Sequence, residues 1–104
     1  ADEGAALCRE VGSPRVRLLF DCYHMRIMGG DVIPQIDRTI DTIGHFHVAG
    51  VPGRHEPFTG EMDYRPVFDH LRNCNWRGVA AFEYGPSLDD HGESLRRSIA
   101  ACTP

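Results

Sequence analysis

Three short apolar segments, each carrying a polar side chain at or near its end, set the strongest limit on how this chain can fold. They cover residues 16–21, 45–49 and 78–83. Apolar residues recur at helical spacing in the segments around them, near 2–11, 34–43, 64–73 and 92–101. Strands that alternate with amphipathic helices pair in parallel through right-handed crossovers. The sequence therefore predicts an α/β fold in which one helix precedes three strand–helix units.

Polar side chains gather where these expected strands end. Asp21 and Glu83 are the last residues of the first and third segments, and His47 lies in the second. In parallel α/β folds, above all in the eight-stranded barrel, the carboxyl ends of the strands form the edge that carries the chemistry. We therefore expect Asp21, His47 and Glu83 to converge at one edge of the sheet. We expect His45 to face away from His47.

Charge and composition exclude several classes of function. A net charge of −4 argues against the basic face that nucleic acids require, and no apolar run approaches the length of a membrane span. All eleven basic residues are Arg, so the chain has no lysine for Schiff-base chemistry. The four cysteines form no CxxC pair, and the first residues do not resemble a secretory signal. We expect a cytoplasmic protein with reduced thiols and no nucleic-acid or membrane partner.

Four stretches of the chain carry its most specific motifs. They are DCYHM at 21–25, HFHVAGVPGRHEP at 45–57, GEMDY at 60–64 and FEY at 82–84. Together they resemble the last three strand ends of hydroxypyruvate isomerases and ketose 3-epimerases, within the xylose-isomerase-like barrel superfamily. A complete barrel takes about 250 residues. The resemblance therefore implies that residues 1–104 are one partial domain, the C-terminal part of a (β/α)8 TIM barrel.

The resemblance also implies a divalent metal site. In the family, Mg²⁺ or Mn²⁺ is held by four side chains from four successive strands, and Asp21, His47 and Glu83 match the second, third and fourth of them. The first ligand, a Glu, has no counterpart in this chain. Hydroxypyruvate isomerases typically place Gln at the third position, whereas the epimerases place His. An imidazole in place of an amide oxygen shifts the preference from Mg²⁺ toward Mn²⁺ or Co²⁺.

The activity implied by the resemblance is a metal-dependent aldose–ketose isomerisation of a small sugar or hydroxy-keto acid. The expected reaction converts hydroxypyruvate to tartronate semialdehyde by proton transfer through an enediolate. Glu83 would be the catalytic acid and base as well as a metal ligand. His24 and Arg54 would bind the substrate, and the planar fork of Arg54 suits a carboxylate. The full-length protein is expected to be the enzyme, whereas this piece alone is expected to be inactive.

Other interpretations stay open. A ketose 3-epimerase of the tagatose or psicose type is favoured by His47 and disfavoured by the VPGRHEP loop at 51–57. An inactive fragment of such a barrel is a further alternative. Asp21 is also a candidate helix cap, because Asp is common at that position. The charged residues at 54–56 lie in a loop that we expect to be flexible and solvated.

The outer strands predict association. A partial barrel would leave the strands at 16–21 and 78–83 with unpaired edges, and such edges tend to pair with other chains. We therefore expect this piece to pack against another copy of itself or against the rest of its barrel.

Overall fold

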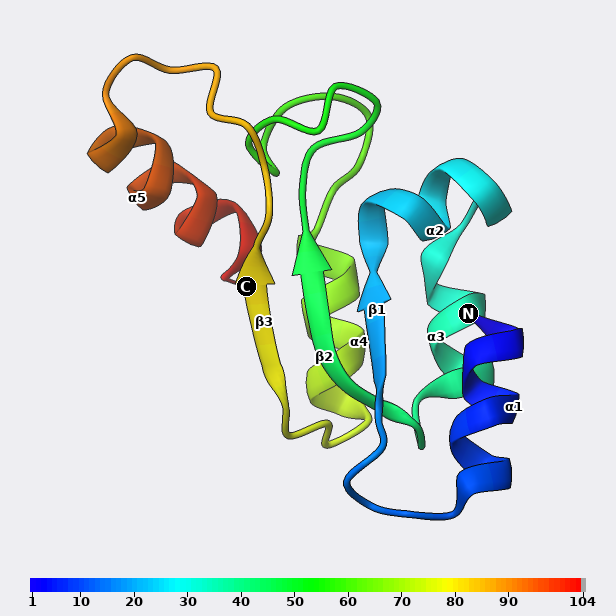
Figure 1. The fold of residues 1–104 in the computed structure, drawn as a ribbon. Coiled ribbons are helices and arrows are strands. Elements are labelled where there is room, and N and C mark those ends of the chain that lie inside the picture. The colour runs from blue at the N-terminus through cyan, green and yellow to red at the C-terminus, as the bar shows by residue number, and fades with distance from the viewer. Residues whose placement is uncertain (104) are drawn as a thin grey trace.

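The computed structural model describes residues 1–103, which form one sheet and the helices around it. The elements follow the order α1 (Asp2–Val11), β1 (Leu18–Asp21), α2 (Cys22–Gly29), α3 (Val32–Thr39), β2 (Ile43–Val48), α4 (Arg65–Asn73), β3 (Val79–Phe82) and α5 (His91–Cys102) (Figure 1). The predicted alternation of strands and helices is confirmed, with one additional helix, α2.

The sheet is parallel, and its strands follow chain order, β1-β2-β3. Asp21 pairs with His47, and His47 pairs with Ala81 on the other side. All three strands therefore end at the same edge, at the top of Figure 1. This arrangement confirms the predicted parallel α/β fold of a partial barrel.

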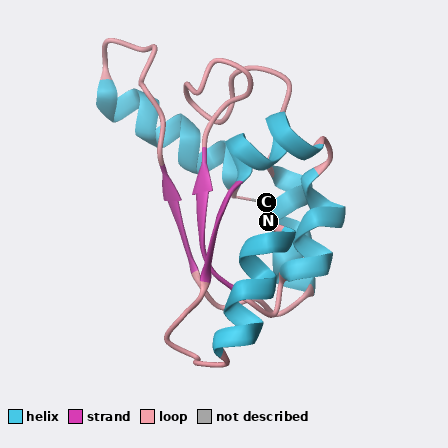
Figure 2. Cartoon of the chain, turned by 45° about the vertical axis from the view of Figure 1, so that its right-hand side comes forward, coloured by secondary structure: helices cyan, strands magenta, loops and turns pink. Residues whose placement is uncertain are grey.

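One face of the sheet packs against helices and forms the core. Phe20 and Phe46, from adjacent strands, are buried with ring centroids 5.2 Å apart. Apolar side chains of α3 and α4, such as Ile36 and Leu71, complete the same cluster. Figure 2 shows helices standing on this side of the sheet. Burying a side chain of this size contributes about 1.5–3 kcal/mol to the stability of the fold. The helical spacing of such residues in the sequence places them on the sides of α3 and α4 that face the sheet.

The opposite face of the sheet is open. Leu19 and Val79 are 48% and 60% exposed there. His45 and His47 lie on this same face, with ring centroids 5.1 Å apart. The expectation that His45 faces away from His47 is therefore wrong. Side chains alternate along a strand with a period of two residues, so positions i and i+2 share a face.

The additional helix, α2, begins immediately after β1. The Asp21 carboxylate accepts a hydrogen bond from the His24 backbone N–H at 3.1 Å, so Asp21 is the N-cap of α2. The helix ends at Gly29, and its C-cap residue is Gly30, whose φ of 79° suits glycine. The helix-cap interpretation of Asp21 is thus confirmed, although the helix starts at Cys22 and leaves no linker after the strand.

The segment between β2 and α4 is a folded loop. The Glu61 backbone N–H donates to the Val51 carbonyl at 2.8 Å, and Thr59 N–H donates to the Glu56 carbonyl at 2.8 Å. Gly60 has a φ of 83°, and a side chain there would collide with the Val51 carbonyl. Within the described residues, no helix has the length and hydropathy needed to cross a membrane.

Candidate metal and substrate site

Three side chains meet at the carboxyl ends of the strands. Asp21 closes β1, His47 lies near the end of β2, and Glu83 follows β3 directly. His47 Nδ1 is 3.0 Å from Glu83 Oε2 and 4.0 Å from Asp21 Oδ2. One ligand atom from each residue lies within 4.8 Å of the others. The sheet register produces this convergence, because it places the three strand ends side by side.

Arg54 connects the two carboxylates of this cluster. Its Nη2 donates to Asp21 Oδ2 at 3.2 Å and to Glu83 Oε2 at 2.6 Å. The guanidinium lies over the Tyr23 ring, 4.9 Å from its centroid. The Arg54 carbonyl also accepts a hydrogen bond from Gly85 N–H at 2.9 Å, which fixes the loop against the chain after β3. The loop therefore holds Arg54 in place over the strand ends.

His24 stands at the rim of the cluster. Its Nε2 is 3.7 Å from Asp21 Oδ2, and its side chain is 48% exposed. Its ring meets the Tyr23 ring edge-on, with centroids 5.2 Å apart. All five residues predicted for the site thus lie in one group: Asp21, His24, His47, Arg54 and Glu83. Their roles stay predictions.

The charges around Glu83 keep this carboxylate ionised. Partial burial raises its pKa, but His47 and Arg54 outweigh that effect and lower the pKa below its usual range. The Glu83 side chain is 51% exposed, whereas that of Asp21 is 13% exposed. Glu83 is therefore an ionised carboxylate that solvent can reach.

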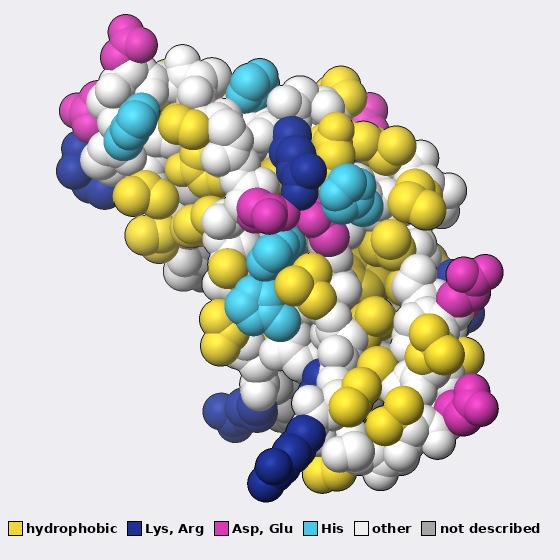
Figure 3. All heavy atoms as spheres, in the orientation of Figure 1, with side chains coloured by type: hydrophobic (Ala, Val, Ile, Leu, Met, Phe, Trp, Pro, Cys, Tyr) yellow, Lys and Arg dark blue, Asp and Glu magenta, His cyan; other side chains and the backbone are white. Residues whose placement is uncertain are grey.

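The donor set fits a divalent cation. Two carboxylates and one imidazole are ligand types that Mn²⁺, Co²⁺ and related ions accept. The same carboxylates hold the Arg54 guanidinium, so this position already stabilises a positive charge. In Figure 3, acidic, histidine and arginine side chains gather on the open face over the strand ends. The cluster can therefore supply three protein ligands and leave the remaining coordination positions to substrate or water.

Glu56, which we expected to be solvated in a flexible loop, is buried instead. The residue is 0% exposed. Its carboxylate accepts hydrogen bonds from the backbone N–H groups of Ser87 and Leu88 and from the hydroxyls of Ser87 and Ser94. Burial raises its pKa, but these donors outweigh burial and lower the pKa to about 2. The donors are at least 31 positions away, so no local pattern could have indicated them.

Glu56 is therefore a structural carboxylate that joins two loops beside the candidate site. It fixes the loop that carries Arg54 to the segment that follows Glu83. His55 adds a second link, because its Nδ1 lies 2.8 Å from the Gly85 carbonyl. These contacts set the distance between Arg54 and Glu83.

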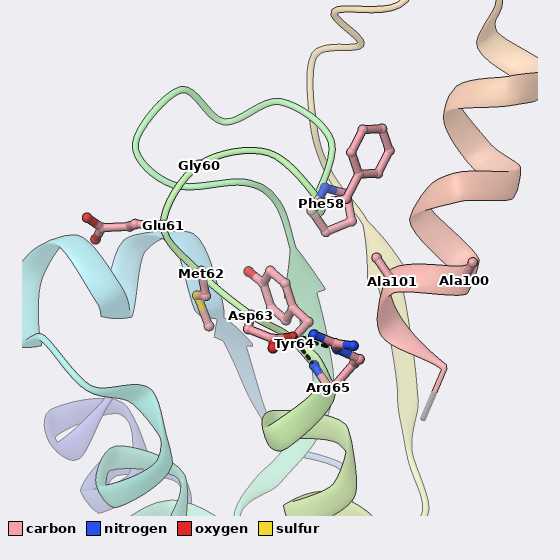
Figure 4. A pocket seen from close by; sticks show the side chains of 10 residues that line it. Phe58, Gly60, Glu61, Met62, Asp63, Tyr64, Arg65, Ala100 and Ala101 are labelled. Carbon is pink, nitrogen blue, oxygen red and sulfur yellow. Dashed lines mark hydrogen bonds and ion pairs between the residues drawn. The ribbon is translucent and has the colours of Figure 1, made fainter.

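A hollow of about 520 Å³ lies elsewhere, between the 57–65 loop and the end of α5 (Figure 4). Phe58 and Ala101 both line it, and Asp63 pairs with Arg65 at 3.0 Å beside them. None of the five predicted site residues lines it, so this hollow is separate from the group at the strand ends.

Comparison with known proteins identifies related sequences. A family model described as "Xylose isomerase-like TIM barrel" matches residues 1–101. The chain is 44% identical over 85 residues to the 2-oxo-tetronate isomerase of Cupriavidus necator, covering 82% of this chain and 33% of that protein. It is 35% identical over 80 residues to the hydroxypyruvate isomerase of Escherichia coli K12, covering 77% of this chain and 31% of that protein. The chain thus spans about a third of the length of these relatives.

Solved structures show the same architecture. A Brucella melitensis protein described as AP endonuclease, family 2, is 34% identical, with a TM-score of 0.80 over 86% of this chain and 35% of that chain. A D-psicose 3-epimerase, crystallised in the presence of D-fructose, is 25% identical, with a TM-score of 0.80 over 95% of this chain and 41% of that chain. Both similarities place the three strands described above within a larger fold.

Proposed function

Because the chain belongs to the xylose isomerase-like TIM barrel family, we propose that it supplies the C-terminal part of the active site of a metal-dependent isomerase. The substrate class is a small 2-oxo acid with a hydroxyl on the neighbouring carbon, such as hydroxypyruvate or 2-oxo-tetronate. The observation that carries the proposal is the convergence of Asp21, His47 and Glu83 at the strand ends. The names of the two isomerase relatives support the substrate class.

The proposed reaction moves one proton between adjacent carbons. In hydroxypyruvate, Glu83 takes a proton from C3 and leaves an enediolate. A proton returned to C2 and one transferred between the two oxygens give tartronate semialdehyde, which has the same atoms. A divalent cation, Mg²⁺, Mn²⁺ or Co²⁺, held by Asp21, His47 and Glu83, would polarise the carbonyl and hydroxyl oxygens. The ionised state of Glu83 supports its role as the base.

A second carboxylate on the opposite face of the substrate would come from the rest of the polypeptide. Glu56 is unsuitable, because it is buried and both of its oxygens already accept hydrogen bonds. Glu61 is unsuitable as well, because it is not part of the group formed by Asp21, His47 and Glu83, and its carboxylate pairs instead with Arg26 of α2 at 3.1 Å. The proposed site is therefore completed by residues outside this chain, as the one-third coverage of the relatives also suggests.

Arg54 and His24 are the proposed substrate contacts. The described hydrogen bonds from the Arg54 side chain use Nη2, and a guanidinium carries five N–H donors. The other donors can bind the carboxylate of a 2-oxo acid in a forked geometry. His24 is half-exposed beside Asp21, within reach of a substrate hydroxyl.

A ketose 3-epimerase is the second candidate function. The imidazole of His47 at the third ligand position favours it, and so does the similarity to the D-psicose 3-epimerase structure. Its substrates are neutral, so Arg54 would have no carboxylate to bind. A nucleic-acid substrate gains no support from a net charge of −4.

The test uses a complete polypeptide of the relatives' length, stripped of metal and then supplied with Mn²⁺. We expect turnover of hydroxypyruvate or 2-oxo-tetronate that is lost on chelation. Glu83→Gln should lower the rate by ~10²–10⁴-fold, the usual effect of losing an acid–base group. Glu93→Gln, an exposed change on α5, is the matched control and should leave the rate unchanged. Full activity in the chelated protein or in Glu83→Gln contradicts the proposal, and faster conversion of D-psicose identifies the epimerase instead.

Two further expectations accompany the proposed function. All four cysteines have free thiols in the described residues, which supports a reducing compartment such as the cytoplasm. The open face and the unpaired strand edges support packing against the rest of a barrel or against another copy.

A further inference from the structure

A second group of metal-ligating side chains lies on the helical side of the molecule, away from the strand ends. It consists of Asp37 on α3, His70 on α4 and Cys74 at the end of α4. His70 Nε2 is 2.6 Å from Asp37 Oδ1 and 3.7 Å from Cys74 Sγ. The three ligand atoms lie within 4.8 Å of one another. They belong to three different ligand types, which makes this group distinct from an exposed acidic cluster.

The fold fixes the positions of these side chains. His70 and Cys74 are one helical turn apart, and the Cys74 N–H donates to the His70 carbonyl at 3.0 Å. The chain then turns at Asn75, whose φ is 55°. Helices α3 and α4 are in contact, which brings Asp37 to the same point. The His70 side chain is only 26% exposed, because it faces α3.

A nucleophilic thiol activated by a histidine and a carboxylate does not explain the group. Such a relay requires the thiol and the carboxylate to contact different ring nitrogens of the histidine. Here both contact Nε2. O, S and N atoms that all lie within 4.8 Å of one another are instead suited to hold a single ion.

We propose that Asp37, His70 and Cys74 form a second divalent-metal site, selective for Zn²⁺-like ions, that joins α3 to α4. Zinc bonds of ~2.0 Å to N and O and ~2.3 Å to S place tetrahedral ligands roughly 3.3–3.6 Å apart. The His70–Cys74 separation of 3.7 Å lies just above this range, so only a small movement would bring both atoms to ligand distance. The Asp37 side chain is 56% exposed, so it is free to rotate outward from 2.6 Å to admit the ion. Water completes the coordination.

The two sites differ in chemistry. The thiolate of Cys74 favours zinc over Mg²⁺, whereas the carboxylates of Asp21 and Glu83 suit harder ions. The second site would therefore stabilise the packing of neighbouring helices and take no part in proton transfer. Its ion would be retained under conditions in which the first site exchanges Mg²⁺ or Mn²⁺.

Cobalt titration of the complete polypeptide, first stripped of metal, tests the proposal. A thiolate bound to Co²⁺ gives a near-ultraviolet charge-transfer band, and the cluster of Asp21, His47 and Glu83 contains no thiol. We expect one equivalent of Co²⁺ to produce this band and Zn²⁺ to displace it. Cys74→Ser should abolish the band. Asp37→Asn should weaken Co²⁺ binding by at least ~10-fold, because mutating a residue that only hydrogen-bonds to a metal ligand already lowers metal affinity by that factor.

Cys8→Ser, a change at a half-buried thiol on α1, is the matched control and should keep the band. As a second measurement, Zn²⁺ should raise the melting temperature of the wild type and of Cys8→Ser, but not that of Cys74→Ser. Because Cys74 is exposed, its Ser variant is expected to fold. A wild type without the band, or a band that persists in Cys74→Ser, overturns the proposal.

Discussion

Two carboxylates near the strand ends are held in opposite ways. Glu83 is half-exposed, and its contacts with His47 and Arg54 both use Oε2, so the carboxylate remains reachable for a substrate or an ion. Glu56 is buried and surrounded by neutral donors that use both of its oxygens. At the scale of single residues, exposure and the type of partner therefore separate a candidate catalytic acid from a structural one.

The stability of the loops should depend on Glu56. Glu56→Gln keeps the shape of the side chain but replaces charge-assisted hydrogen bonds by neutral ones, which are weaker. We expect the free energy of unfolding of the complete polypeptide to fall by about 1–3 kcal/mol, measured by urea denaturation. Glu61→Gln, in the same loop but exposed, should change it by less than about 0.5 kcal/mol. Equal effects of the two variants would contradict the structural role of Glu56.

The contribution of Glu56 should also depend on pH. Its pKa is lowered from 4.5 to about 2 in the folded protein. Its ionised form therefore stabilises the fold above pH 4.5, and this stabilisation is lost as the pH falls toward about 2. The difference in unfolding free energy between the wild type and Glu56→Gln should accordingly shrink on acidification across this range. A difference that stays constant would contradict the lowered pKa.

At the scale of elements, aspartates define where several helices begin. Asp21, Asp31 and Asp90 are the N-caps of α2, α3 and α5, and each carboxylate accepts a hydrogen bond from a backbone N–H in the first turn. Asp21 serves two purposes, because it also lies in the candidate site. Changing Asp21 would therefore disturb a helix and a proposed metal ligand together.

Asp31 offers a cap without that complication. Its carboxylate accepts from Ile33 N–H at 3.3 Å, and it lies outside both metal-ligand groups. Asp31→Ala should lower the free energy of unfolding by about 1 kcal/mol, because one helical N–H loses its partner. Asp31→Asn should retain most of the stability, since Asn also caps helices well. Urea denaturation followed by circular dichroism measures both, and a loss of equal size in Asn would argue that the cap is unimportant.

At the scale of the whole molecule, three strands leave one face and two edges of the sheet without partners. Helices cover only the core face, and Leu19 and Val79 stay exposed on the other. The face that carries His47 and Asp21 would therefore form one wall of the proposed site. The relatives are about three times as long as this chain.

We expect the chain by itself to associate and to be inactive. The exposed edges of β1 and β3 invite pairing, and the proton-transfer partner of Glu83 is absent from the described residues. Size-exclusion chromatography with light scattering should give a mass above that of the 11.6 kDa monomer. Assays with Mn²⁺ should show no turnover, while the complete polypeptide under the same conditions serves as the control. A folded monomer, or robust turnover abolished by Glu83→Gln, would contradict this expectation.

The sequence by itself determined the alternation of elements and the convergence at the strand ends. Apolar periodicity is a local property, so it specifies which residues form strands and which helix faces turn inward. Parallel pairing then brings Asp21, His47 and Glu83 to one edge without further information. The motifs around these residues added the family, and the family description matched to residues 1–101 agrees with it.

Only the tertiary structure decided the contacts between distant segments. Glu56 and its serine donors, or Asp37 and His70, are more than 30 positions apart and carry no periodic signal. Their meeting depends on how helices and loops pack on the sheet, which is a property of the whole chain. Helix α2 was missed because only one of its eight residues, Cys22, is buried. Helix α3 is equally short but buries four residues at helical spacing, so its inward face is visible in the sequence.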